Sequence, residues 1–454
     1  MEKTIAAIST ANGVGGLGVI RISGSESKEI ADRIFRSVSG KRLTQMKPYT
    51  ATYGKIYDGE ELIDEGVALV FCAPHSFTGE DVVEISCHGG MFVTKKVLRC
   101  ILKNGASPAE PGEFTKRAFL NGKMGLTEAE AVMDIISARG EQSARAAALT
   151  MEGSLHKRID RVKQRLTTLA AHLAAWADYP EEDIPQVEET ELRKSLCECR
   201  DELMKLLNSY DAGKVMREGV NTVIAGKPNA GKSTLMNLLS GCERSIVTNV
   251  PGTTRDIIEE TVMLGDIPLN LSDTAGIHDT NDPVELIGVQ RAKDRLKKAG
   301  LVLAVFDSSQ ELSEDDRELT ELLGTTPSIA IINKTDLPQK LDVDYIKSKT
   351  KHIVYISALS GEGLQSLENE VAELVGTASL DPSEGILSSE RQYSAANSAL
   401  GAVNEAIDAI ELGITLDAVT VSIEGAIGYL CELVGESVNE TVVNSVFHSF
   451  CVGK

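Results

Sequence analysis

The sequence has no run of 18 consecutive apolar residues, so no segment of it predicts a membrane-spanning helix. The first residues, Met1-Glu2-Lys3-Thr4, lack the charged and apolar regions of a signal peptide. The eight cysteines are scattered, and the close pair Cys197 and Cys199 has a spacing that suits neither a usual zinc site nor a disulfide framework. We therefore expect a cytoplasmic protein without a membrane segment, in which most thiols are structural.

Positive charge is also scarce, because 46 Lys and Arg residues stand against 67 Asp and Glu, which gives a formal net charge of −21. Such a charge opposes nonspecific binding of nucleic acid, so an RNA substrate would need a local basic patch or a basic partner. With 454 residues, of which 42% are hydrophobic, the chain is long enough for about three domains.

The pattern of apolar residues divides the chain into regions. Residues 1 to about 118 predict an α/β or β-rich region, and residues from about 126 to 210 and from 386 to the end predict helices. The polar segments 179–185 and 377–385 interrupt the helical pattern. In the first region the expected strands are Ile5–Ile8, Gly18–Ile22, Thr50–Tyr57, Val67–Cys72 and Val82–Ser86, and the expected helices are Glu26–Arg36, which Ser25 is able to cap, and Met91–Asn104.

A glycine-rich segment directly after the apolar run Val220–Ala225 indicates phosphate binding. It reads Gly226-Lys227-Pro228-Asn229-Ala230-Gly231-Lys232-Ser233, is followed by Thr234, and fits the phosphate loop that joins a strand to a helix. The glycines let consecutive backbone N–H groups face phosphate oxygens. Lys232 adds a charge near the β- and γ-phosphates, and Ser233 offers a hydroxyl to Mg²⁺.

Three later segments, each after an expected strand, point to guanine nucleotide hydrolysis. Asp273-Thr274-Ala275-Gly276 supplies a carboxylate for the Mg²⁺ shell. In Asn333-Lys334-Thr335-Asp336 a carboxylate can accept two hydrogen bonds from a guanine edge, and Ser357-Ala358-Leu359 can close the base pocket. In this order the segments resemble the motifs of a Ras-like GTPase domain, although each tetrapeptide alone could be an ordinary polar loop.

The segment between the phosphate loop and Asp273 suggests how the metal ions are held. It contains Thr248-Asn249-Val250-Pro251-Gly252-Thr253-Thr254, in which Thr254, with Thr253 as second choice, is expected to coordinate Mg²⁺. Ile277 stands where Ras-like enzymes place a water-positioning Gln, so hydrolysis must rely on another group. The side chain of Asn229 and backbone carbonyls of residues 248–253 could hold a K⁺ ion that neutralises phosphate charge.

Motifs outside the nucleotide-binding region carry a resemblance to a known family. They are Val19-Ile20-Arg21-Ile22-Ser23-Gly24, Ser76-Phe77-Thr78-Gly79-Glu80-Asp81, His88-Gly89-Gly90, Pro111-Gly112-Glu113-Phe114-Thr115, Arg117-Ala118-Phe119-Leu120-Asn121-Gly122-Lys123 and the terminal Cys451-Val452-Gly453-Lys454. With the phosphate loop, they resemble the tRNA-modification GTPase family MnmE, also called TrmE, over essentially the whole chain. Val452 stands where the family usually shows Ile.

The resemblance implies a multidomain fold of α/β and α regions. The expected domains are an N-terminal α/β tetrahydrofolate-binding and dimerisation domain (1–118), a helical domain in two parts (119–213 and 378–454) and an inserted Ras-like P-loop G domain (214–377). It further implies a potassium-activated GTPase that forms a homodimer whose G domains meet upon GTP binding. In a heterotetramer with the FAD-dependent partner MnmG (GidA), it would modify C5 of the wobble uridine of certain tRNAs to aminomethyl or carboxymethylaminomethyl forms, using 5-formyl- or methylene-tetrahydrofolate.

The resemblance also implies roles for individual residues. Folate contacts fall on Arg21, Glu84, Lys123 and Lys454; K⁺ ligands on Asn229, Thr248, Val250 and Thr253; and Mg²⁺ ligands on Ser233 and Thr254. Glu285 corresponds to the acid that positions the attacking water, and Cys451 to a thiol near the folate that acts as nucleophile or proton shuttle.

Simpler interpretations of two of these residues, and of the function, remain open from the sequence. On sequence alone, Glu84 reads as an exposed strand residue and Glu285 as a carboxylate at a helix start. An alternative function is a regulatory or ribosome-assembly GTPase that acts only as a binding switch. That class usually carries an RNA-binding KH domain with a GXXG loop, whereas the C-terminal region here is acidic helix without such a loop.

Overall fold

A computed structural model describes residues 3–11, 13–178, 188–241, 258–272, 299–323, 326–378 and 380–453. The chain divides into two compact units, which are described separately. The terminal unit comprises Met1–Met133 and Cys431–Lys454, and the central unit comprises Asp134–Leu430. Both ends of the sequence therefore belong to one unit.

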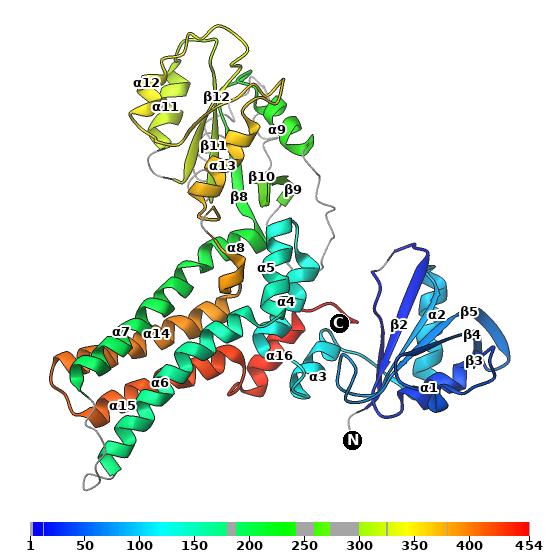
Figure 1. Ribbon diagram of the computed structural model, residues 1–454. Coiled ribbons are helices and arrows are strands. Elements are labelled where there is room, and N and C mark those ends of the chain that lie inside the picture. Colours follow the sequence, from blue (N-terminus) through cyan, green and yellow to red (C-terminus); the bar gives the residue numbers. More distant parts are fainter. Residues whose placement is uncertain are drawn as a thin grey trace. The chain divides into compact units, whose positions relative to one another are not determined.

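Within its described part, the terminal unit contains a seven-stranded sheet in the order β3-β4-β5-β6-β2-β1-β7. The pairs are antiparallel except β1 with β7. Helices α1 (Ser27–Ile34) and α2 (Met91–Lys103) bury their apolar side chains against one face of the sheet (Figure 1). The strands are β1 (Ile5–Ile8), β2 (Leu17–Ser23), β3 (Phe35–Ser37), β4 (Thr50–Asp58), β5 (Glu61–Phe71), β6 (Val82–His88) and β7 (Ser107–Pro108).

The expected strands and helices of this region are present, with two corrections. The first helix ends at Ile34 rather than Arg36, because Phe35–Ser37 pairs with β4 as a strand. Ser25 does not cap this helix: the residue before it is Glu26, whose backbone N–H donates to Thr4 Oγ1 at 3.1 Å. Thr4 thus binds the backbone of the residue before the helix, and the helix has no side-chain cap of its own.

The C-terminal residues complete the terminal unit. Helix α16 (Glu440–His448) packs beside α3 (Glu113–Leu120), with Phe447 and Phe450 in a cluster that also contains Leu126 at the start of α4 (Leu126–Ser137). Beyond α16, Val452 forms an isolated antiparallel bridge with Pro111. The last described residues therefore lie against the loop that leads into α3.

The central unit combines a helical region with a second sheet. Helix α7 packs against α14 and α6, and Ser389 caps α14 through a hydrogen bond from the backbone N–H of Gln392. The helices are α5 (Glu141–Met151), α6 (Ser154–Asp178), α7 (Glu189–Asn208), α8 (Tyr210–Glu218), α14 (Glu390–Glu411) and α15 (Leu416–Val434), with a short 3₁₀ helix, η2 (Pro382–Glu384), before α14.

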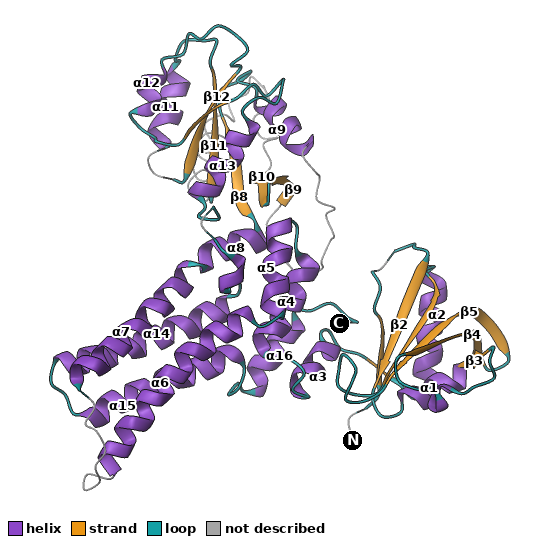
Figure 2. Cartoon of the chain, viewed as in Figure 1, coloured by secondary structure: helices purple, strands orange, loops and turns teal. Residues whose placement is uncertain are grey.

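Between α8 and η2 the chain forms a nucleotide-binding type of α/β fold (Figure 2). In its described part, six strands lie in the order β13-β12-β11-β8-β10-β9, parallel except for β9. Helices α9 and α13 pack on one face and α11 and α12 on the other. The elements are β8 (Val220–Ala225), α9 (Lys232–Gly241), β9 (Ile258–Leu264), β10 (Ile267–Ser272), β11 (Leu301–Asp307), α11 (Glu314–Leu322), β12 (Ser328–Asn333), α12 (Val343–Lys347), β13 (Ile353–Tyr355) and α13 (Leu364–Leu374).

This topology places the candidate site. Strands β8, β11, β12 and β13 are parallel neighbours, so their carboxyl ends meet at one edge of the sheet, where ligands bind in open α/β folds. Within the described ranges, no helix is both long and apolar enough to cross a bilayer.

Candidate functional sites

The phosphate loop leaves β8 and enters α9 as expected. Gly226 and Gly231 have φ angles of 155° and 99°, and Asn229 adopts a left-handed φ of 63°. A β-carbon on Gly226 would collide with the carbonyl oxygen of Val305 on β11, so the loop lies close to the neighbouring strand. Lys232 Nζ donates to the carbonyls of Gly226 and Lys227 at 2.8 and 2.9 Å, and so points back across the loop.

The first turn of α9 presents the hydroxyls of Ser233 and Thr234, and both residues are exposed. The open N–H groups and the dipole at this helix end favour an anion there. The geometry is that of a phosphate cradle with a hydroxyl at hand for a metal ion.

The Asn-Lys-Thr-Asp segment contacts both the phosphate loop and the Ser-Ala-Leu loop. The Asn333 Nδ2 atom donates to the Ala230 carbonyl at 3.0 Å, and its Oδ1 accepts from the Ala358 backbone N–H at 3.0 Å. Ser357 Oγ donates to Asp336 Oδ1 at 2.7 Å, which orients that carboxylate. Leu359 is 83% exposed and so offers an uncovered apolar surface beside it. The structure therefore brings the three expected segments together through Asn333, with the Asp336 carboxylate beside the Ser-Ala-Leu loop.

Lys334 links the phosphate loop to the end of β11. Its Nζ donates to the Asn229 carbonyl at 2.9 Å and lies 2.6 Å from Asp307 Oδ2 at the end of β11. Burial alone would raise the pKa of the Asp307 carboxyl, but hydrogen bonds from Lys334 and Ser309 outweigh burial and hold its pKa below the ordinary value. Asp307 was not among the residues predicted from the sequence, although it ends an apolar strand just as Asp273 follows one.

Several expected nucleotide and metal ligands lie outside the described residues. These are Thr248, Asn249, Val250, Pro251, Gly252, Thr253, Thr254, Asp273, Thr274, Ala275, Gly276 and Glu285, together with Ile277. Of the expected K⁺ and Mg²⁺ ligands, the structure thus describes Asn229 and Ser233, and both are exposed in the loop and at the start of α9.

A second group of expected residues lies in the terminal unit. Arg21 on β2 and Glu84 on β6 are opposite each other in the strand register, and their Nε and Oε1 atoms are 2.8 Å apart. Both side chains are mostly buried, at 15% and 22% exposed. The Arg21 guanidinium also lies over the rings of Phe77 and Phe114, 5.3 and 5.5 Å from their centroids. Glu84 is therefore not the freely exposed strand residue that its local sequence suggested.

Lys123 and Cys451 approach this region through the loops around α3. Lys123 Nζ donates to the Pro74 carbonyl at 3.0 Å, in the loop that also carries Phe77. The backbone N–H of Gly112, which precedes α3, donates to the Cys451 carbonyl at 3.4 Å. Cys451 is exposed, whereas Lys454 lies outside the described residues.

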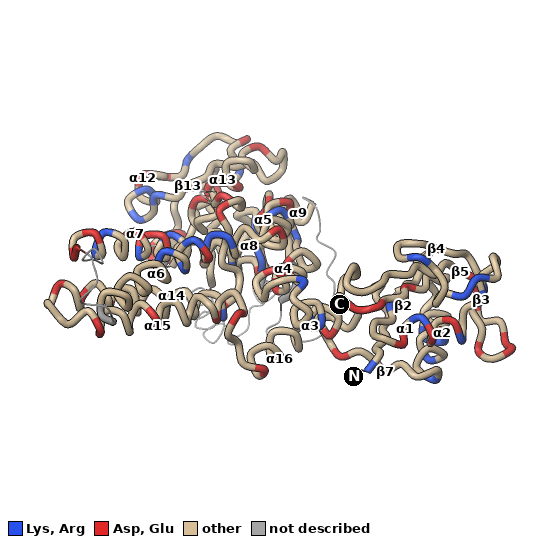
Figure 3. Tube along the Cα trace, turned by 60° about the horizontal axis from the view of Figure 1, so that its bottom comes forward, with Lys and Arg blue, Asp and Glu red and all other residues tan. Residues whose placement is uncertain are grey.

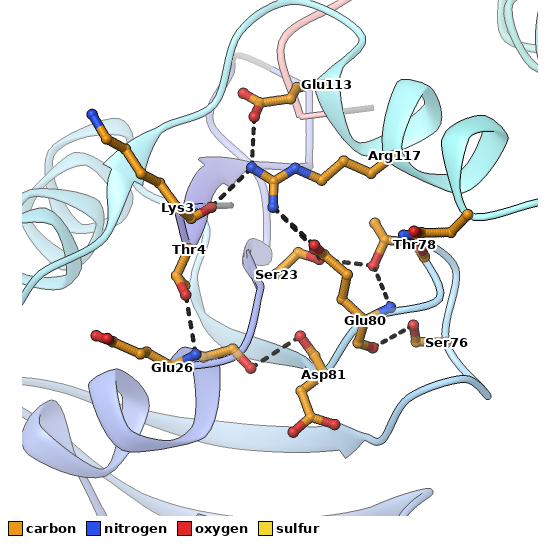
Figure 4. Close-up of polar contacts among 12 residues, drawn as sticks. Lys3, Thr4, Ser23, Glu26, Ser76, Thr78, Glu80, Asp81, Glu113 and Arg117 are labelled. Carbon is orange, nitrogen blue, oxygen red and sulfur yellow. Dashed lines mark hydrogen bonds and ion pairs between the residues drawn. The ribbon is translucent and has the colours of Figure 1, made fainter. Parts of the chain in front are cut away.

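A buried ion network fixes the loop that carries Phe77, and its role escaped the sequence analysis. Arg117 on α3 lies 3.1 Å from Glu80 Oε2 and 2.8 Å from Glu113 Oε1, and it also donates to the Lys3 carbonyl (Figure 4). Ser23 Oγ donates to Glu80 at 2.7 Å. Burial lowers the pKa of Arg117, but the hydrogen bonds and charges of Glu113 and Glu80 outweigh burial and raise it. The i,i+4 spacing of Glu113 and Arg117 was the available sequence signal.

The central unit thus has the strand–loop–helix phosphate cradle and the base-pocket segments of a Ras-like G domain, and the class of protein is a P-loop GTPase. Two family models match the chain: the GTP-binding protein TrmE N-terminus over residues 4–123 and the MnmE helical domain over residues 126–451.

Full-length relatives define the family. The tRNA modification GTPase MnmE of Clostridioides difficile is 42% identical over 457 residues, covering 100% of both chains, and that of Alkaliphilus oremlandii is 43% identical over 459 residues with the same coverage. The chain therefore belongs to the MnmE family of tRNA-modification GTPases.

Solved structures with partial similarity were also found. The G domain of the T. maritima FeoB iron transporter is 28% identical and covers 34% of this chain and 98% of its own, with a TM-score of 0.25. An Era structure in complex with MgGDPNP and a 16S ribosomal RNA segment is 29% identical and covers 40% of this chain and 66% of its own, with a TM-score of 0.26.

Proposed function

We propose that the protein is a potassium-activated GTPase that works with an FAD-dependent MnmG partner on the wobble uridine of certain tRNAs. It would place an aminomethyl or carboxymethylaminomethyl group on C5, with the carbon supplied by 5-formyl- or methylene-tetrahydrofolate. The observation that carries the proposal is the presence, in one chain of this family, of a phosphate loop joined to base-pocket segments and of a separate Arg21–Glu84 pair in the unit that contains the exposed thiol of Cys451.

In the G domain, the proposed roles follow the chemistry of phosphate transfer. Lys232 and the loop N–H groups would hold the phosphates, Ser233 and Thr254 the Mg²⁺, and Asp336 the guanine edge. Mg²⁺ would neutralise charge that develops on the phosphates. The support in the described residues is the pair of hydrogen bonds that Asn333 makes to Ala230 and Ala358, because they join the phosphate loop to the base pocket.

K⁺ would take the place of an arginine finger. The proposed ligands are the side chain of Asn229 and groups of Thr248, Val250 and Thr253, with Glu285 positioning the attacking water. The fit of Asn229 is supported by its exposure and by its left-handed backbone, which Lys334 fixes through the Asn229 carbonyl. The side chain is thereby left to the ligand while the backbone is held.

Tetrahydrofolate would bind in the terminal unit, and the residues there fit it. The amino-pyrimidine edge of a pteridine needs a carboxylate acceptor, which Glu84 supplies; within the described residues, only its Oε1 is engaged, by Arg21. Phe77, which is partly exposed, offers a flat apolar surface beside the pair, and the buried Phe114 supports Arg21 from within the core. Arg21, Lys123 and Lys454 would balance the negative charge of the glutamate tail, and Cys451 would act as nucleophile or move a proton.

The proposed assembly and domain limits follow the family. The chain would form a homodimer and a heterotetramer with MnmG in the cytoplasm, with domains at residues 1–118, 119–213, 214–377 and 378–454. The competing function is a regulatory or ribosome-assembly GTPase that acts only as a binding switch. Such a switch has no use for a folate site, so folate binding separates the two.

The deciding experiment measures three quantities on one preparation of the full-length protein. They are equilibrium binding of 5-formyl-tetrahydrofolate, GTP turnover in K⁺, and restoration of wobble-uridine modification in a deletion strain. Glu84→Gln should weaken folate binding and abolish modification while turnover stays normal. The matched control is Glu61→Gln, because it breaks a surface ion pair between Glu61 at the start of β5 and Lys96 of α2. Absence of folate binding by the wild type, with unchanged wobble uridine in the deletion strain, would instead support the binding switch.

A further inference from the structure

Helix α6 reverses the charge balance of the chain. Over Ser154–Asp178 it carries five Lys and Arg residues and two acidic residues, Asp160 and Asp178, whereas acidic residues outnumber basic ones by 67 to 46 overall. Blue segments follow one another along α6 in Figure 3. The five cations are Lys157, Arg158, Arg161, Lys163 and Arg165.

Three of these cations form a row on the exposed face of the helix. Lys157, Arg161 and Arg165 follow one another at four-residue intervals and are all exposed. At that spacing neighbouring β-carbons lie about 5–6 Å apart, and the row extends about 12 Å along the helix axis. The opposite face, with Leu155, Ile159, Val162 and Leu166, is buried. We call Lys157, Arg161 and Arg165 the α6 basic row.

The stability of the helix does not account for this row. Lys157 lies in the first turn of α6, where the helix dipole favours acidic side chains. Like charges four residues apart repel each other, so both adjacent pairs within the row oppose helix formation. Acidic partners are few: Arg165 lies 3.3 Å from Glu198, with both side chains about half exposed, and Arg161 has no carboxylate partner among the described residues. Lys157 Nζ donates to a backbone carbonyl, that of Glu152, at 3.3 Å.

The other two cations of α6 have structural roles. Arg158 is buried and donates to the carbonyls of Glu384 and Gly385 at 3.3 and 3.2 Å, and Lys163 lies 3.2 Å from Asp160. On α7, by contrast, three of the four cations are paired with acids, namely Arg193 with Glu411, Arg200 with Asp201 and Lys205 with Glu202, whereas the exposed Lys194 has no acidic partner among the described residues. The neighbouring helix thus has the mixed surface of an ordinary acidic protein, and the α6 basic row does not.

The chemistry of the row favours a polyanion over a protein partner. Its exposed neighbours along the helix are polar, namely Gln164, Thr168 and His172, and no large apolar side chain is exposed on the described part of α6. Protein interfaces need an apolar core, whereas nucleic acid backbones are bound by evenly spaced cations. We propose that the α6 basic row binds the phosphate backbone of tRNA. This inference rests on the proposed function, since it supplies the local basic patch that an RNA substrate of so acidic a chain requires.

The test compares two triple variants of the full-length protein that remove the same charge. One is Lys157→Gln, Arg161→Gln and Arg165→Gln; the control is Arg193→Gln, Arg200→Gln and Lys205→Gln. Fluorescence anisotropy with labelled tRNA is recorded over a series of KCl concentrations. Each lost phosphate contact reduces the magnitude of the slope of log K against log salt by about 0.7–0.9, so the α6 variant should lose about 2–3 units of slope and roughly 10²- to 10³-fold in affinity near 0.1 M salt. The control should keep the wild-type slope.

Variants that keep, remove or reverse the charge at position 161 distinguish a loss of tRNA binding from a loss of folding. Arg161→Lys should bind tRNA nearly as well as the wild type, and Arg161→Glu should bind more weakly than Arg161→Gln, while GTP turnover and folate binding stay normal in all three. Equal losses in the α6 and control variants, an unchanged slope in the α6 variant, or loss of MnmG capture with normal tRNA binding would each overturn the proposal. If the wild type binds tRNA through the α6 basic row but modifies no wobble uridine, the proposed tRNA-binding surface stands and the proposed function is refuted.

Discussion

The side-chain amide of Asn333 occupies the space that a β-carbon on Gly231 would need. Asn333 comes from the carboxyl end of β12, and Gly231 is the last glycine of the phosphate loop. From this position the Asn333 amide donates to the Ala230 carbonyl and accepts from the Ala358 backbone N–H. The missing side chain at residue 231 therefore allows one residue to join the phosphate loop to the base pocket.

Replacing Gly231 tests this relationship. Gly231→Ala puts a side chain at a φ of 99° and displaces the Asn333 amide, so we expect a loss of guanine nucleotide affinity of roughly 10- to 10²-fold, the cost of about 1–3 kcal/mol for such strain. Calorimetric titration with GDP measures it. Gly241→Ala is the control, because Gly241 ends the same helix and a β-carbon there meets no atom within 4 Å. Equal affinity in both variants would show that the contact does not matter for binding.

The ion pair between Asp307 and Lys334 predicts a pH dependence. Because the pKa of Asp307 is depressed in the folded protein, its contribution to stability is present above the unfolded carboxyl pKa of about 3.9 and is lost as the pH falls through the folded value. Asp307→Asn should therefore lower the urea midpoint most near neutral pH and progressively less below about pH 4. Asp408→Asn, an exposed carboxylate on α14, should show no such trend. A deficit that does not shrink in acid would contradict the ionic role of Asp307.

The parts of the site that depend on residues close in sequence could be predicted. The contacts between residues far apart in sequence could not, so the predicted site was incomplete. The phosphate loop and the strands before it follow from glycine spacing and apolar runs, which depend on local backbone requirements. The contact of Asn333 with Ala230 joins residues 103 positions apart, and the Arg117 pairing with Glu80 spans 37. Such pairings arise from packing of elements against one another, and no periodicity in the sequence records them.

The same distinction explains the errors in the first region. Ser25 has the right local chemistry for a cap, but the helix begins two residues later, and the N–H of the intervening Glu26 is bound by Thr4 from another segment. Phe35 continues an amphipathic helical pattern, yet pairing with Ile56 on β4 draws it into the sheet. In both places tertiary contacts override local preference.

The contact between the β9–β10 hairpin and α5 predicts a stability effect. Asp266 Oδ1 accepts from the backbone N–H groups of Glu141 and Gln142 at 2.9 and 3.3 Å, and so caps α5 from outside the helix. Asp266→Ala should lower the free energy of unfolding by about 0.5–2 kcal/mol, the usual effect of losing a cap, whereas Asp266→Asn should nearly preserve it. Urea denaturation gives both values. Equal losses for Ala and Asn would point to charge rather than capping.

Potassium dependence follows from the proposed role of Asn229. GTP turnover should be much faster in K⁺ than in Na⁺, with an upper bound of about 10³–10⁵, the effect of an arginine finger. Asn229→Ala should remove the difference between the two ions, because it deletes the side-chain oxygen and leaves the carbonyl that Lys334 binds. Steady-state phosphate release at matched ionic strength provides the measurement. Equal rates of the wild type in Na⁺ and K⁺ would refute the potassium site.

Cys451 provides a way to separate the two proposed activities. Its backbone carbonyl accepts from Gly112 in the terminal unit, whereas the phosphate loop and base pocket belong to the central unit. Cys451→Ser keeps the size and polarity of the side chain but replaces a thiol with a far weaker acid and nucleophile. We expect normal K⁺-stimulated hydrolysis of GTP, near-normal binding of 5-formyl-tetrahydrofolate and loss of wobble-uridine modification. Cys431→Ser, a partly buried thiol, serves as the control and should modify tRNA normally. If Cys451→Ser still modifies wobble uridine, the thiol takes no part in the one-carbon chemistry. If folate binding falls together with modification, Cys451 shapes the folate site rather than serving as nucleophile or proton shuttle.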